Sequence, residues 1–142
     1  MKKSVLYFAV LVCMMVQTLS ASANERIISA EQLPASVVSF IEEFYPGQDV
    51  SYAVFGSDFS KTIYEVYLDN GVELEFDESG EWNMVDCVFD AVPACIVPSA
   101  IVKFVRKNFP NAKIVKIEKE DYGFDVELSN GRGVRFDYDE VL

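Results

Sequence analysis

Histidine is absent from this 142-residue chain. Its absence removes the side chain that most often serves as a general base and as a metal ligand. The sequence also lacks a Gly-x-Ser-x-Gly elbow, a phosphate-binding loop, a Gly-x-Gly-x-x-Gly fingerprint and a His-Glu-x-x-His motif. Carboxylates are plentiful, but they alternate along expected strands, as the solvated side of a sheet does. We therefore predict that the chain is not an enzyme and uses no cofactor and no metal.

Basic residues are scarce, and two of them mark an export signal. Lys2 and Lys3 precede an apolar run over residues 5–16, and the small residues 21–23 (Ala-Ser-Ala) follow it. This pattern predicts a secretory signal peptide over residues 1–23. The apolar run is shorter than the roughly 20 residues that cross a bilayer. Lipidation at Cys13 is an alternative, but a bulky valine precedes that cysteine. We expect a bacterial periplasmic or secreted protein with no membrane span after cleavage.

Residues 24–142 carry 23 acidic and 10 basic residues, a formal charge of −13. A nucleic-acid-binding protein needs a basic face, so this charge excludes that class. The imbalance lies in residues 24–90, with 15 acids and 2 bases, whereas residues 91–142 hold 8 of each. The length suits one domain with a sizeable core.

Only two cysteines follow the predicted signal, Cys87 and Cys95. In an oxidising compartment such a pair favours a disulfide over a metal site. Closing so short a loop would stabilise the fold by about 2–3 kcal/mol. Two free cysteines remain the alternative, since spacing alone does not exclude it.

The chain repeats itself. Residues 33–46 and 97–110 both begin with an apolar residue and proline, end in aromatic-proline, and carry an apolar stripe at helical spacing. Residues 64–77 and 124–137 share six identities in fourteen positions, and each has Asn-Gly between alternating apolar runs. That pattern predicts a tight hairpin whose Asn and Gly both take positive φ. We predict a single domain over residues 24–142 with repeat one at 31–90 and repeat two at 91–142.

Further strands are expected at residues 50–55, 114–118 and 82–86, while the last strand of repeat two should be truncated or absent. The fold class is thus α+β: two tandem α-β-β-β(-β) repeats that form one mostly antiparallel sheet of seven or eight strands, with two helices packed on one face. Alternation places one set of apolar residues under the helices. That set is Tyr64, Val66, Leu68, Leu74, Phe76, Phe124, Val126, Leu128, Val134 and Phe136. The placement of Trp82 is left open by the pattern.

The order Leu-Pro, helix, aromatic-Pro, strand, Tyr-Glu-Val, Asn-Gly, Glu-Phe-Asp and Gly-x-Trp resembles the secreted PepSY-like family, also described as β-lactamase-inhibitor-like. The resemblance covers nearly all of residues 24–142, although repeat two lacks the Gly-x-Trp ending. It implies a periplasmic or secreted location. It also implies two tandem repeats and a sheet face that grips a protein target.

The opposite face of the sheet is our candidate for a partner-binding surface. The candidate residues are Tyr52, Glu65, Tyr67, Glu73, Glu75, Asp125, Glu127 and Arg135. Tyrosines supply contact area with few rotors, and acids speed encounter with a basic patch. We predict an exported protein-binding or inhibitor-type module whose partner is another protein of the envelope or medium.

The alternative is a periplasmic protein that binds a small ligand, a peptide or a metal in a cleft. The acidic run over residues 69–81 could hold Ca²⁺, but its Asn-Gly is already explained by a turn, and EF-hand spacing is absent. An enclosed apolar pocket would favour the carrier, and a broad open sheet would favour protein binding.

Overall fold

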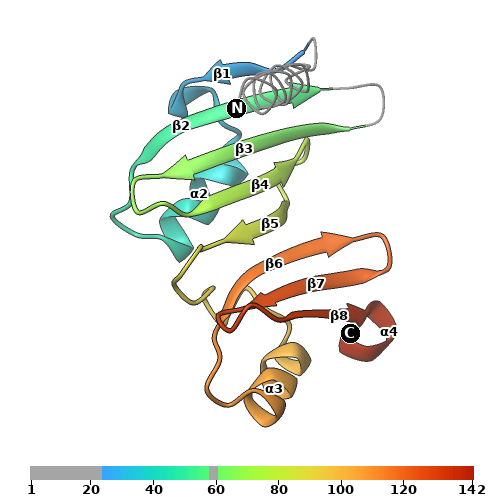
Figure 1. Cartoon of the computed structure of the whole chain (residues 1–142). Helices are drawn as coiled ribbons and strands as arrows, with labels where there is room; N and C mark the ends of the chain where they lie inside the picture. Colours follow the sequence, from blue (N-terminus) through green and yellow to red (C-terminus); the bar gives the residue numbers. More distant parts are fainter. Residues whose placement is uncertain (1–23, 58–60) are drawn as a thin grey trace, which may run out of the picture.

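The computed structural model describes residues 24–57 and 61–142, and the predicted signal peptide and Cys13 lie outside them. The described residues form one antiparallel sheet whose eight strands lie in chain order (Figure 1). The strands are β1 (Arg26–Ile28), β2 (Val50–Ser57), β3 (Thr62–Leu68), β4 (Glu73–Asp77), β5 (Trp82–Asp86), β6 (Ile114–Glu120), β7 (Gly123–Leu128) and β8 (Gly133–Asp137). The helices are η1 (Ala30–Gln32, a 3-10 turn), α2 (Ala35–Phe44), α3 (Ser99–Asn108) and α4 (Tyr138–Val141). No helix in this part of the chain is long and apolar enough to span a membrane.

The two long helices begin and end in the same way. Pro34 and Pro98 stand at their N-caps, with φ of −55° and −51°, where a missing N–H leaves no bond unmade. The C-cap residues Tyr45 and Phe109 each donate a last backbone bond, to the carbonyls four residues earlier, at 2.8 and 2.7 Å. A proline follows each C-cap, and it turns the chain out of the helix.

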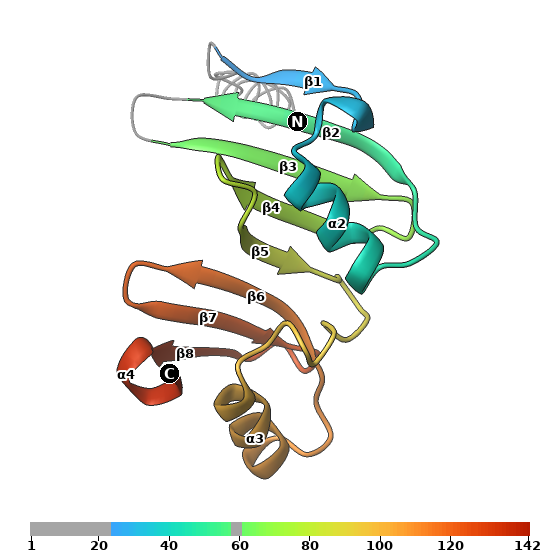
Figure 2. The ribbon, with the colours of Figure 1, turned by 180° about the vertical axis from the view of Figure 1, so that it is seen from behind.

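The core lies between the sheet and these helices, on one face (Figure 2). One cross-strand row runs through the buried residues Val66, Leu74, Val85, Ile117 and Val126. Val37 and Ile41 of α2 and Ile101 and Val105 of α3 pack into the same cluster. Each fully buried aliphatic side chain contributes roughly 1.5–3 kcal/mol. The predicted helix-facing set is therefore confirmed, with Tyr64 and Val134 only partly buried.

The Asn-Gly hairpin turns differ from the prediction. Gly71 and Gly131 have φ of +86° and +81°, but neither Asn70 nor Asn130 has positive φ. Instead the Asn side chains accept backbone N–H groups two residues on, at 3.1 and 3.0 Å. The glycine N–H groups bond to Leu68 and Leu128 carbonyls, which is the pattern of a type I turn closed by a left-handed glycine.

The sheet has eight strands, within the predicted seven or eight, but the eighth strand is not the one considered from the sequence. The eighth strand is β1, which pairs Ile27 with Val54 and was not expected from the sequence. After β8 the chain forms α4 instead of another strand, and the Glu140 carboxylate accepts the N–H of Asp137 at 3.3 Å. This agrees with the expected loss of the last strand. The tandem repeat itself stays a prediction.

The structure also resolves the placement of Trp82. Glu75 pairs with Met84 and Phe76 with Trp82, so Asn83 is an extra residue in β5. This bulge sends Trp82 to the helix side, where it packs against the core and Lys119 Nζ lies 4.1 Å from the ring centroid. Met84 points to the opposite face.

Candidate functional site: the open face of the sheet

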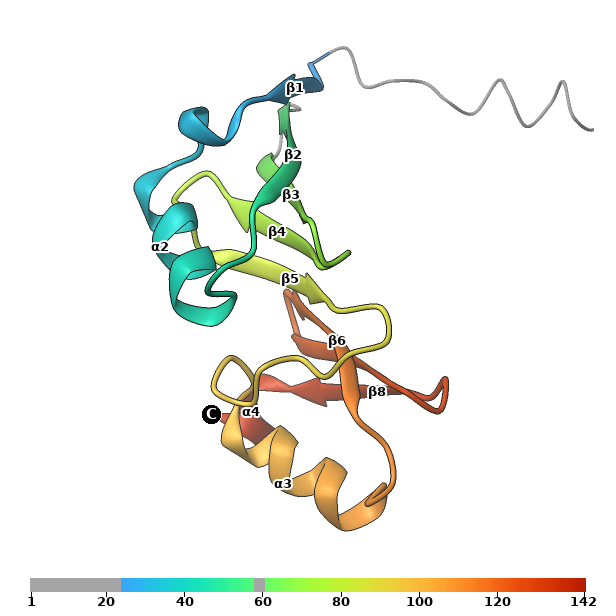
Figure 3. The same cartoon turned by 90° about the vertical axis from the view of Figure 1, so that its left-hand side faces the viewer.

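The side of the sheet away from the helices, which we call the open face, faces the viewer in Figure 1 and lies edge-on in Figure 3. Strand pairing defines it as two cross-strand rows. The first row is Val54, Glu65, Glu75, Met84, Glu118, Asp125 and Arg135. The second is Tyr52, Tyr67, Glu73, Asp86, Lys116, Glu127 and Gly133. All eight candidate residues lie in these rows, and their role in binding stays a prediction.

Two tyrosines stack at the β2–β3 end of the second row. Their ring centroids are 4.3 Å apart with planes 14° from parallel, and Tyr52 is 46% exposed. The Tyr67 hydroxyl lies 3.3 Å from Glu65 Oε2 and 3.2 Å from Glu73 Oε1, so its one proton serves two carboxylates. Burial and these two acids raise the pKa of Tyr67 well above its usual value. The ring is thus held neutral and fixed beside exposed aromatic surface.

Glu75 is a carboxylate of this group whose ionised form is disfavoured by its surroundings. It stands directly opposite Glu65 on β3, and cross-strand like charges repel. Burial raises the pKa of Glu75, as do the charges of Glu118, Glu65 and Glu73, while Lys61 opposes the shift. A positive group brought against this spot would stabilise the ionised carboxylate.

The β6–β8 part of the open face has paired charges instead. Arg135 Nε donates to Asp125 Oδ1 at 3.2 Å, and its guanidinium lies 4.4 Å from the Tyr122 ring centroid. Hydrogen bonds from Tyr122 and Arg135 lower the pKa of Asp125, and partial burial and the bond to Asp125 raise the pKa of Tyr122 to about 12. Lys116 Nζ lies 3.7 Å from a Glu118 oxygen.

A shallow depression of about 530 Å³ lies over these strands. Charged side chains of Lys116, Glu118, Asp125, Glu127 and Arg135 contribute much of its lining. It is therefore an open depression bordered by charged groups rather than an enclosed pocket.

Sequence reasoning missed the centre of the face. Met84 is buried there, and its position follows from the bulge at Asn83, which breaks the alternation in β5. Lys116 and Glu118 could have been found from the sequence. They flank the buried Ile117 in β6, so alternation places their side chains on the open face.

The acidic run over residues 69–81 is explained by turns. Although partial burial opposes it, hydrogen bonds from Ser79 and from the Glu81 and Gly80 backbone lower the pKa of Asp77. One Asp77 oxygen accepts the Ser79 N–H at 2.8 Å and the Glu81 N–H at 3.0 Å. Among the described residues no group of three or more Cys, Asp or Glu is arranged to hold a metal ion.

The predicted disulfide is not formed in this structure. Cys87 and Cys95 are free thiols, the first buried and the second exposed. The Cys87 sulfur lies 3.4 Å from the Tyr45 hydroxyl at the end of α2. Burial raises the pKa of the Cys87 thiol, so the buried sulfur acts here as a packing group. A disulfide in the oxidised protein stays a prediction.

The described residues thus form a small α+β protein with one antiparallel sheet, helices on one face and a second face left open. Residues 62–142 match the family described as "Putative beta-lactamase-inhibitor-like, PepSY-like", and the chain belongs to this family. No curated protein matches the chain.

Three solved structures are similar to the chain over most of its length. A Bacteroides vulgatus protein, called a "putative periplasmic protein", is 38% identical with a TM-score of 0.79, over 84% of this chain and 94% of that one. One from Bacteroides thetaiotaomicron, called a "putative calcium-regulated periplasmic protein", is 38% identical with a TM-score of 0.77, over 82% and 91%. A second Bacteroides vulgatus protein, of unknown function, is 35% identical with a TM-score of 0.76, over 80% and 91%. These three neighbours are described as periplasmic proteins, which supports the predicted periplasmic or secreted location.

Proposed function

We propose that this protein is a binding module that holds another protein of the envelope or medium against its open face, in the manner of an inhibitor. The observation that carries the proposal is the cluster of three carboxylates, from Glu65, Glu73 and Glu75, around the stacked rings of Tyr52 and Tyr67. The inhibitor-like family description supports the same class.

Two physical terms favour a basic protein surface as the ligand. The tyrosine stack offers a rigid aromatic contact that loses little entropy on binding. Glu75 is half-buried, and its pKa stays raised although Lys61 opposes the shift, so a lysine or arginine from a partner would further stabilise the ionised carboxylate. Glu65 and Glu75 lie directly opposite each other and repel in the free protein. A positive group of the partner would attract both carboxylates, whereas a neutral or negative group would gain no such binding energy.

The open form of the face favours a protein over a small ligand. The depression over β6–β8 is shallow and lined largely by charged groups, whereas small-molecule sites are concave and mostly apolar. The name of the Bacteroides thetaiotaomicron relative makes calcium a variable to control, so binding should be measured with calcium and with a chelator.

The test uses residues 24–142 as bait for the envelope fraction of the producing cell. A captured protein is then purified, and its association rate is measured against salt concentration. For the variant Glu65→Gln/Glu73→Gln/Glu75→Gln we expect association about tenfold slower at low salt and a flatter salt dependence.

The matched control is Glu31→Gln/Glu42→Gln/Glu43→Gln, which removes the same charge from η1 and α2, on the helix side. Its association rate should stay within about twofold of the parent. Equal slowing by both variants would mean that net charge, not the open face, governs the encounter. Unchanged rates for both would contradict the proposal.

A further inference from the structure

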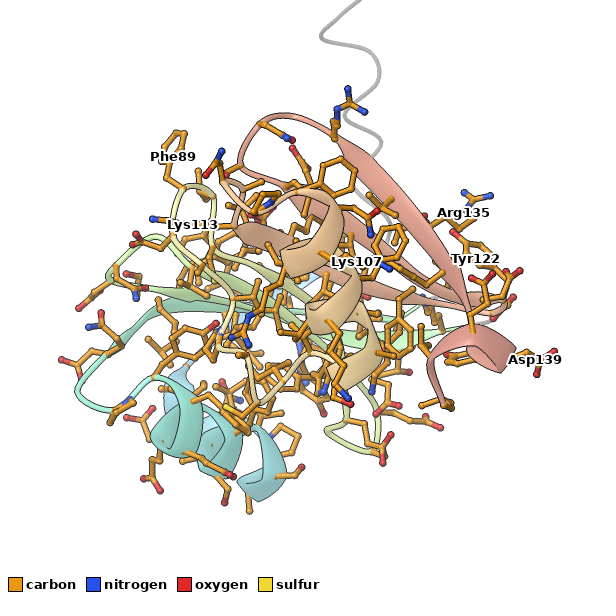
Figure 4. All side chains as sticks on the ribbon, turned by 90° about the horizontal axis from the view of Figure 1, so that it is seen from below. Phe89, Lys107, Lys113, Tyr122, Arg135 and Asp139 are labelled. Atoms are coloured by element: carbon orange, nitrogen blue, oxygen red, sulfur yellow. The ribbon has the colours of Figure 1, made fainter. Side chains whose placement is uncertain are left out.

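The linker between β5 and α3 begins with a tight turn over residues 86–90, which we call the Phe89 spur. Asp86 Oδ1 accepts the Val88 N–H at 2.8 Å, and the Cys87 carbonyl accepts the N–H groups of Phe89 and Asp90 at 2.6 and 3.1 Å. The Phe89 side chain is 84% exposed, and Figure 4 shows it pointing away from the molecule. A fully exposed aromatic ring on a hydrogen-bonded turn is a preformed contact group.

The spur also holds a strained residue. Val88 has φ of +59° and is the one non-glycine residue with positive φ in the described part of the chain. A β-branched residue is disfavoured there, and a bond from residue i+2 back to residue i around it is a strained γ-turn. The exposed Phe89 and the strained Val88 are adjacent, so the fold holds the ring outward at a cost in stability.

A groove lies a few residues further on, between the linker and α3; we call it the α3 groove. It has a volume of about 260 Å³, and a cavity of about 150 Å³ already holds benzene. Its lining is mainly apolar, and Arg106 and Lys113 supply its charge. The apolar lining residues are Ala91, Val92, Ala94, Val97, Val102, Val105, Ala112 and Ile114.

The spur and the groove are complementary in charge as well as in shape. Asp86 and Asp90 flank Phe89, and both lie close enough to the Cys87 thiol to affect it electrostatically. The groove offers Arg106 and Lys113 around an apolar floor. An aromatic ring between two acids therefore matches an apolar groove with two bases.

We propose that the partner of this surface is a second copy of the chain, in a two-fold dimer where each Phe89 enters the α3 groove of the other copy. Phe89 does not fill the groove of its own chain, because the ring is exposed. Ala91 and Val92, just after Phe89, line the groove, so the Phe89 spur and the α3 groove lie side by side. A two-fold axis that passes between the Phe89 spur and the α3 groove places the spur of each copy against the groove of the other.

The dimer goes beyond the proposed function, and its contacts centre on the linker and α3, although Asp86 of the spur also belongs to the second row of the open face. No residue of the Tyr52, Glu65, Glu73 and Glu75 group takes part in it. The variant Glu65→Gln/Glu73→Gln/Glu75→Gln is therefore a control that should leave the dimer intact.

The experiment is sedimentation equilibrium of residues 24–142 up to millimolar concentration, with reductant because Cys95 is exposed. We expect a monomer–dimer equilibrium. Phe89→Ala should raise the dimer dissociation constant at least a hundredfold, about what is expected when two buried rings are lost per dimer. Phe89 is on the surface, so the far-UV spectrum and the urea midpoint should not change when both are measured at a concentration where the parent is monomeric.

A mixing test separates this interface from any other. Asp90→Arg and Arg106→Asp each place like charges at the contact and should each be monomeric. Mixed in equal amounts they should regain dimer, because one spur–groove contact then has its charges reversed but complementary. A monomer at every concentration, a dimer unaffected by Phe89→Ala, or no recovery on mixing would each overturn the proposal.

Discussion

The charge of Glu75 should make the free protein less stable than it could be at neutral pH. We expect Glu75→Gln to stabilise the fold there. Glu75 is half-buried and directly opposite Glu65, and its pKa is raised by burial and by the acids around it. Glutamine keeps the size of the side chain and removes the charge, and the Tyr67 hydroxyl bonds go to other carboxylates.

The magnitude follows from the cross-strand pair. Like charges directly opposite on neighbouring strands destabilise by about 0.2–1 kcal/mol. Loss of the attraction to Lys61 offsets part of the gain. We therefore expect Glu75→Gln to raise the free energy of unfolding by about 0.5 kcal/mol. In urea this would move the midpoint up by about 0.3 M for a slope near 1.5 kcal/mol/M.

The pH dependence of stability is a second test of the predicted direction, namely that Glu75→Gln stabilises the fold. The folded protein holds the Glu75 proton to a higher pH than the unfolded chain does, since the folded pKa is raised. Stability is therefore lost as pH rises from the ordinary glutamate pKa through the raised one. The advantage of Glu75→Gln should be small at acidic pH and should grow to its full size at neutral pH.

The assay is urea unfolding at several pH values, followed by the fluorescence of Trp82, the single tryptophan of the chain. The matched control is Glu127→Gln on β7, opposite Lys116, where removing the charge should slightly destabilise the fold. A loss of stability for Glu75→Gln at neutral pH, or a gain that does not vary with pH, would refute the reasoning.

Two further predictions concern turns. Gly80→Ala should destabilise the fold by at least about 2 kcal/mol, because φ is +82° and the added Cβ would lie 1.8 Å from Ser36 Oγ on α2; Gly71→Ala, with φ of +86° but no atom within 4 Å, should cost only about 1 kcal/mol in the same urea assay. An equal loss for the two variants would mean that the contact with α2 is unimportant. Val88→Asn should stabilise the fold by about 1 kcal/mol, since asparagine tolerates a φ of +59° and the valine side chain is half exposed; a lower urea midpoint would contradict the assigned strain.

Much of the fold follows from local pattern. The prolines that bracket α2 and α3 set the ends of the helices, and the alternation in β3 and β4 assigns Leu74 to the core and Glu75 to the open face. The eight candidate residues share that face because each hairpin fixes the parity of both its strands. Their common location was therefore predictable, although the Tyr52–Tyr67 stack depends on side-chain geometry that spacing does not give.

The misses have physical causes. β1 is three residues long, too short to show a period, and its strand conformation comes from pairing with β2. The Asn83 bulge reverses the parity within β5, so no alternation rule could place both Trp82 and Met84. The hairpin glycines were anticipated, but the turn type was not, because Asn can also serve by accepting a backbone N–H. The start of α4 had a signal in Asp137 and Glu140, spaced as a capping box.

The order of the strands has a consequence for how the protein reaches its folded state. Every strand pairs with the strand that precedes or follows it in the chain, and the longest connection, between β5 and β6, contains α3. Assembly can thus proceed from the N-terminal end, each new strand adding to an edge that already exists, and the two long connections each contain a helix that shortens the span to be closed. Such a chain should acquire its structure quickly and progressively as it emerges, with little time for unpaired edges to meet those of other molecules.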